Sequence, residues 1–158
     1  KTFNLAGLQG SNIFIPDPGL RKAYVDALGR LGDLSVSMMA MAATTAAYET
    51  GGPWVDELVG YLAGSVDAVR SGLERVPGVS LVEPQGTYLM WLDCAGLAHR
   101  LGDRPLDDFM VNEARLWMNA GTKFGGAQGG NFERMNIATQ RATVNEALAR
   151  LARAVDRL

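Results

Sequence analysis

Two basic side chains are candidates for chemistry, and they lie far apart in the 158-residue chain. Lys1 begins an apolar, glycine-containing segment, and desolvation there would favour the neutral amine that attacks an aldehyde. Arg134 follows a glycine-rich stretch, and its guanidinium is suited to holding a carboxylate through two parallel hydrogen bonds. Residue type alone also allows simpler interpretations: a solvated terminal lysine and a strand arginine that points to solvent.

The other reactive residue types do not suggest a second site. The chain has one cysteine, Cys94, with no histidine beside it in the sequence, so we expect an unreactive thiol. Its one histidine, His99, leaves no histidine cluster for zinc, and no metal site is expected. Residues 125–130 lack the G-x-G-x-x-G spacing of a nucleotide cradle, and we interpret them as a flexible active-site loop.

Composition narrows the class of protein. The 15 basic and 17 acidic side chains give a net charge of −2, which provides no basic surface for nucleic acid. No apolar stretch is long enough for a membrane span, and no signal-peptide pattern appears, so a cytoplasmic enzyme is expected. Because the chain starts with Lys1 and enters an apolar segment at once, we expect it to be part of a longer protein.

The first half of the chain reads as a strand and helices. Residues 12–15 form a short apolar run that predicts a buried strand. Asp17 and Pro18 are typical of a helix start, and that helix should end near residue 29. The Met- and Ala-rich residues 34–48 predict a buried helix or helix pair. A long helix should then run over 53–76.

The second half reads as a layer of strands and helices. Strands are predicted at 79–82, 87–93 and 132–138, the last of which carries Arg134. A helix should span 105–119 with Gly121 as its C-cap. Thr143 and Glu146 have the spacing of a capping box for the last helix. Few strands among several helices indicate an α/β or α+β fold.

Two motifs resemble one known family. Residues 1–9 (KTFNLAGLQ) resemble the segment that begins at the cofactor-binding lysine of class I/II aminotransferases (fold type I), especially their cystathionine β-lyase-like, carbon–sulfur lyase branch. Residues 123–125 (KFG) and 132–138 (FERMNIA) resemble the carboxylate-binding motif of that family. Many members of the wider class have an arginine where this chain has Gln9, and this difference favours the lyase-like branch.

The resemblance implies a cofactor, a fold and site residues. The cofactor would be pyridoxal 5′-phosphate (PLP), with Lys1 as the catalytic, cofactor-binding lysine that forms the Schiff base and shuttles the substrate's α-proton. Arg134 would bind the substrate carboxylate. The implied fold is α/β, PLP-dependent transferase-like, with residues 1–50 as the C-terminal portion of the large domain. A linking helix over 51–78 and an α+β small C-terminal domain over 79–158 would follow.

The implied activity is that of an aminotransferase or carbon–sulfur β-lyase acting on a small amino acid. The family's active sites lie at a dimer interface, so a homodimer is expected. The upstream half of the same polypeptide is expected to supply the remaining cofactor contacts, and this segment alone should not hold PLP tightly. The alternative is a non-catalytic dimerisation or ligand-binding module that keeps the small-domain fold.

Overall fold

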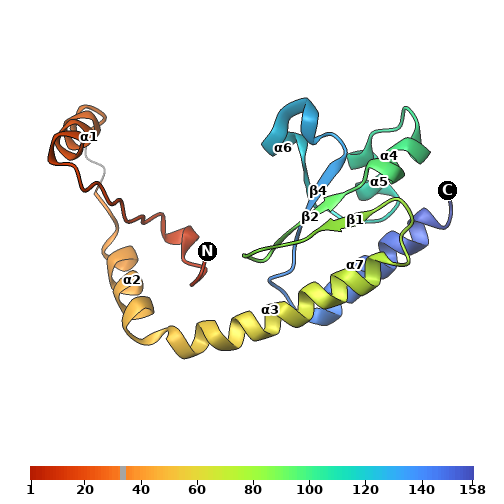
Figure 1. Cartoon of the computed structure of the whole chain (residues 1–158), viewed down its shortest axis with the longest axis horizontal. Coiled ribbons are helices and arrows are strands. Elements are labelled where there is room, and N and C mark those ends of the chain that lie inside the picture. The colour runs from red at the N-terminus through yellow and green to blue at the C-terminus, as the bar shows by residue number, and fades with distance from the viewer. Residues whose placement is uncertain (33–34) are drawn as a thin grey trace. The chain divides into compact units, whose positions relative to one another are not determined.

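The computed structural model describes residues 1–32 and 35–158 (Figure 1). The chain forms two compact units, Lys1–Glu57 and Leu58–Leu158, and the division between them falls within one helix. The three-part division at residues 50 and 78 stays a prediction.

The first unit is built from helices. They are a short 3₁₀ turn, η1 (Ala6–Leu8), then α1 (Pro18–Arg30), α2 (Met38–Thr50) and the start of α3 (Gly52–Leu73). The predicted start of α1 is confirmed. The side chain of Asp17 accepts a hydrogen bond from the backbone N–H of Leu20 at 2.6 Å, and proline occupies the first helical position. These two residues fix the helix start because they satisfy a free N–H and preset φ.

Two buried elements were predicted in the first unit, and neither is buried as predicted. Residues 12–15 form no strand, and Phe14 is 87% exposed. A strand needs a partner for its backbone groups, and the described part of this unit offers none. The predicted helix over 34–48 is present as α2, but only Ala40 is buried and Met38 is 80% exposed. The start of that prediction, Leu34, lies outside the described residues.

The second unit is built around a four-stranded antiparallel sheet with the order β1-β2-β4-β3. The strands are β1 (Ser80–Val82), β2 (Leu89–Asp93), β3 (Asn119–Ala120) and β4 (Phe132–Asn136). The predicted antiparallel pair of β1 and β2 and the predicted last strand are confirmed. The register places Arg134 between Trp91 on one side and Asn119 on the other.

One face of this sheet packs on helices to form the core. Figure 1 shows α7 (Arg141–Val155) and the second half of α3 running side by side along the sheet. The short helices α4 (Ala95–Leu101) and α5 (Leu106–Asn112) lie close to the strands of the same unit. The two central strands, β2 and β4, alternate buried and partly exposed residues, so one side of the sheet faces the core. The largest apolar side chains of this core are Phe109, Met90, Leu92, Leu97, Met110, Ile137 and Leu151.

The predicted helix over 105–119 is too long. It ends at Asn112, and the chain then turns so that the N–H of Ala114 donates to the carbonyl of Phe109. Arg115 has a φ of 57°, in the left-handed region that stops a helix. Gly121 therefore does not cap this helix. It precedes α6 (Thr122–Gly125) instead.

The predicted capping box is also wrong. The last helix begins at Arg141 with Gln140 at the N-cap, and no side chain caps it, so Thr143 lies inside the helix. Glu146 pairs with Arg150 at 2.9 Å, one turn further along the helix. A contact with another helix holds the start of α7. Arg141 donates from its side chain to the carbonyl of Tyr61 on α3 at 2.7 Å.

Candidate active site

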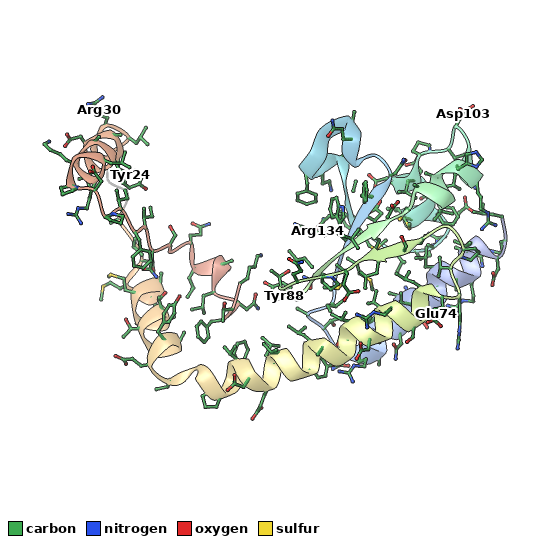
Figure 2. All side chains as sticks on the ribbon, in the orientation of Figure 1. Tyr24, Arg30, Glu74, Tyr88, Asp103 and Arg134 are labelled. Carbon is green, nitrogen blue, oxygen red and sulfur yellow. The ribbon has the colours of Figure 1, made fainter. Side chains whose placement is uncertain are left out.

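Arg134 occupies the middle of β4 on the sheet face that is turned away from the core. Its neighbours Glu133 and Met135 are buried on the core face, and strand alternation therefore places Arg134 on the opposite face. Figure 2 shows Arg134 beside β2 and β4. The side chain is half-buried, so it is accessible to a ligand and yet partly shielded from water.

Two contacts hold the guanidinium of Arg134. Its Nη2 donates to the side-chain oxygen of Asn119 at 2.9 Å, and its Cζ lies 4.1 Å from the centroid of the Phe124 ring. The Nε–H group is buried and has no hydrogen-bond acceptor among the described residues. An unmet buried donor costs roughly 1–3 kcal/mol. A carboxylate, which accepts two parallel hydrogen bonds from a guanidinium, would remove that cost.

Aromatic rings form the surroundings of this guanidinium. Trp91 and Phe132 are stacked with centroids 5.5 Å apart, and the rings of Trp91 and Phe124 form a T-shaped pair with centroids 5.9 Å apart. Ring faces attract a cation without neutralising its charge. Among the residues that the structure describes, no carboxylate forms an ion pair with Arg134. The site therefore keeps a positive charge available to an anionic ligand.

The glycine-rich segment positions Phe124 rather than forming an open loop. Residues 122–129 fold into α6 and a 3₁₀ turn, η2 (Gly126–Gly129), which corrects the expected flexible loop. Gly121 and Gly129 pack backbone against backbone, and a Cβ on Gly129 would overlap the Gly121 carbonyl. The N–H of Gly121 also donates to the carbonyl of Phe132 at 2.8 Å. Glycine at these two positions brings the segment close to β4.

A small cavity adjoins this arrangement. It measures about 210 Å³, and Arg134, Asn119, Asn136 and Thr139 are among its lining residues. Ligand pockets are commonly about 300–1,000 Å³. This cavity is smaller than that range, so only a small molecule would fit in it. Trp117 also lines it and is 91% exposed.

Lys1 belongs to the first unit, in a turn that aromatic packing anchors. Its carbonyl accepts a hydrogen bond from the N–H of Asn4 at 3.0 Å. Phe3 packs its ring against Tyr48 of α2 at 5.5 Å and against Trp54 of α3 at 6.5 Å. Lys1 itself is exposed, so the described residues of this unit do not supply the desolvation that the sequence suggested.

Glu133 is an ionisable group that the sequence reasoning missed. It is 1% exposed, and burial is the main reason why the pKa of its carboxyl rises from 4.5 to about 8. A hydrogen bond to Asp107 and the charge of that carboxylate raise the pKa further, and Lys123 lowers it. Strand alternation carried the signal, because Glu133 shares a face with the buried Met135.

The structure buries the thiol that the sequence analysis expected to be unreactive. Cys94 is fully buried, and burial raises its pKa to about 12, with smaller contributions from Glu133 and Asp93.

Within residues 1–32 and 35–158, no cluster of three or more His, Cys, Asp or Glu side chains is arranged to hold a metal. None of the helices described there combines the length and hydropathy needed to cross a membrane.

Known proteins resemble the chain in sequence and fold. Cystathionine β-lyase PatB of Bacillus subtilis is 37% identical over 157 residues, which are 98% of this chain and 40% of that protein. The structure of cystalysin from Treponema denticola, which contains a pyridoxal 5′-phosphate cofactor, superposes with a TM-score of 0.88 at 27% identity. It matches 99% of this chain and 39% of cystalysin. No family model matches the sequence.

A third comparison agrees with these two. The PLP-bound C–S lyase of Staphylococcus hominis gives a TM-score of 0.85 at 26% identity, over 98% of this chain and 39% of that one. The chain thus spans about two fifths of the length of the relatives it matches. It has the α/β, PLP-dependent transferase-like fold over this span. By sequence and fold together, the chain belongs to the PLP-dependent class I/II aminotransferase family, in its cystathionine β-lyase-like (C–S lyase) branch.

Proposed function

We propose that the protein is a PLP-dependent aminotransferase or carbon–sulfur β-lyase that acts on a small amino acid. The observation that supports this proposal is the unmet hydrogen-bond donor on the Arg134 guanidinium. Asn119 and Phe124 hold its guanidinium, and its buried Nε–H lacks an acceptor. A substrate α-carboxylate would supply that acceptor and gain a charge-assisted hydrogen bond.

Lys1 is the residue proposed to bind the cofactor. When bound, pyridoxal 5′-phosphate supplies an aldehyde for a lysine amine and a ring that withdraws electrons from the substrate's α-carbon. The side chain of Lys1 carries the primary amine that this role requires, and the packing of Phe3 limits the movement of its backbone. Lys1 would also hold the proton taken from the α-carbon and return it later.

The chain does not supply every contact that such a cofactor requires. Gln9 stands where an arginine would bind the phosphate, and it ends η1 with a left-handed φ of 56°. The proposal therefore includes an upstream half of the same polypeptide and a homodimer in the cytoplasm. The exposed apolar side chains of the first unit, such as Phe14 and Met38, support further protein contacts on that unit.

The proposal is tested by replacing Arg134 in the intact, cofactor-loaded protein. The substitution Arg134→Ala should raise KM and lower kcat/KM for amino acids. Loss of a charge-assisted pair should cost roughly 2–5 kcal/mol, which is about 30-fold or more in kcat/KM. Arg75→Ala, at an exposed arginine of the same unit, is the matched control. Unchanged kinetics in Arg134→Ala would remove this arginine from the site, and binding without turnover in the wild type would favour the non-catalytic module.

A further inference from the structure

We propose that Asn119 is a positioning residue for carboxylate binding, and that its neutrality is what keeps the charge of Arg134 available to the substrate. This inference rests on the proposed function, because it concerns how the same arginine is prepared for its ligand. It adds a residue on a second strand to the site, which the motif around Arg134 does not contain.

The geometry fixes one edge of the guanidinium. Asn119 lies directly opposite Arg134 in the pairing of β3 with β4, and its side-chain oxygen accepts from Nη2 at 2.9 Å. With the ring of Phe124 against one face of the guanidinium, rotation about the last bonds of the arginine side chain is restricted. The Nε–H group is left as the donor without an acceptor. The ligand therefore meets an arginine that is already oriented, and less conformational entropy is lost on binding.

The position of Asn119 is itself well determined. It is half-buried in β3, and the next residue, Ala120, is buried and pairs with Glu133. The backbone N–H of Gly121 then donates to the carbonyl of Phe132 at 2.8 Å. Strand pairing on both sides of Arg134 thus sets the distance between the amide oxygen and the guanidinium.

The charge at this position decides what else Arg134 can bind. An amide oxygen accepts one hydrogen bond and leaves the guanidinium charge uncompensated. An aspartate has almost the same shape and would accept the same hydrogen bond, but it would neutralise Arg134 and repel an incoming carboxylate. A purely structural contact would be kept or strengthened by aspartate. A positioning residue that works by being neutral would fail with it, so Asn119→Asp separates the two roles.

The experiment uses the intact, cofactor-loaded protein and two probes. Propionate, the deamino form of alanine, measures carboxylate binding as a competitive inhibitor. Alaninamide, which carries no carboxylate, is the matched probe that this charge should not disfavour. We expect Asn119→Asp to raise Ki for propionate and KM for alanine at least tenfold, with no loss of melting temperature and no weakening of alaninamide. Asn119→Ala should weaken propionate by a smaller factor, and Asn119→Gln should restore part of that loss.

A control and a comparison make the outcomes distinguishable. Asn145→Asp makes the same change at an exposed position of α7 and should leave all of these constants unchanged. If Arg134→Ala leaves propionate binding intact, the proposed function fails. If Arg134→Ala abolishes propionate binding while Asn119→Asp and Asn119→Ala bind it as the wild type does, the inference about Asn119 is overturned and the proposed function stands.

Discussion

Replacing Glu133 by glutamine should stabilise the protein, and increasingly so as the pH rises. Glu133 is 1% exposed, and the pKa of its carboxyl is raised to about 8, first by burial and then by the hydrogen bond and charge of Asp107. One of its oxygens, Oε2, has no hydrogen-bond partner among the residues that the structure describes. Near neutral pH the carboxyl is therefore protonated in the folded state and ionised in the unfolded state.

The sign and size of the effect follow from these two pKa values. Below about pH 4.5 both states hold the proton, and the folded state has its full stability. Between about 4.5 and 8 only the folded state holds it, so stability falls as pH rises, by at most about 1.4 kcal/mol per pH unit. The upper limit is about 5 kcal/mol. Because Asp107 is coupled to this carboxyl, we expect about 2–3 kcal/mol for the single substitution.

Urea denaturation at several pH values between about 5 and 8.5 would measure this effect. Glu133→Gln stays neutral throughout, so the decline in its free energy of unfolding should flatten, and its advantage over the wild type should be largest near pH 8.5. Glu74→Gln, at an exposed carboxyl, is the matched control and should keep the wild-type slope. Parallel profiles for Glu133→Gln and the wild type would refute the assignment of a protonated, buried Glu133.

Three further substitutions test the carboxylate site, the glycine contact behind it and the core. Arg134→Lys should weaken carboxylate binding at least tenfold, because lysine keeps the charge and loses the planar fork; inhibition by propionate measures it, and wild-type affinity would contradict it. Gly129→Ala should lower the melting temperature and weaken propionate together, since a Cβ there overlaps Gly121 and displaces Phe124; a fall in melting temperature alone would separate the segment from the site. Leu151→Ala should cost about 2–5 kcal/mol in urea denaturation because this side chain is 1% exposed, and a cost below about 1 kcal/mol would contradict its place in the core.

Local chemistry predicted element starts better than element ends. Asp17 and Pro18 predicted the start of α1 correctly, because a side-chain oxygen and a fixed φ act within one turn. The end of α5 was missed because Arg115 takes a left-handed conformation that its residue type does not signal. The start of α7 was misplaced because Arg141 is held by Tyr61 on another helix, and no local pattern encodes that contact.

The strands of the second unit were predicted, and the helices that cover them belong to the same unit. β2 and β4 alternate buried and partly exposed residues against that core. In the first unit, the apolar character of residues 12–15 and of α2 indicated contact with other protein, and the described residues do not provide it.

The candidate site was only partly visible in the sequence. Lys1 and Arg134 came from resemblance to a family, since their spacing alone left solvent-exposed interpretations open. Asn119 was not predicted as a site residue, and Phe124 belonged to the resembling motif without a role of its own. Strand register and the packing of Gly121 on Gly129 bring the two residues to the guanidinium.

The proposed bond between Lys1 and the cofactor can be measured directly by chemical trapping. The full-length protein is loaded with pyridoxal 5′-phosphate, reduced with borohydride, digested and mapped by mass spectrometry. Reduction makes the bond between lysine and cofactor permanent. We expect the reduced pyridoxyl group on Lys1, in stoichiometric amount. A modification found on Lys22 or Lys123 instead, or none on any lysine, would contradict it.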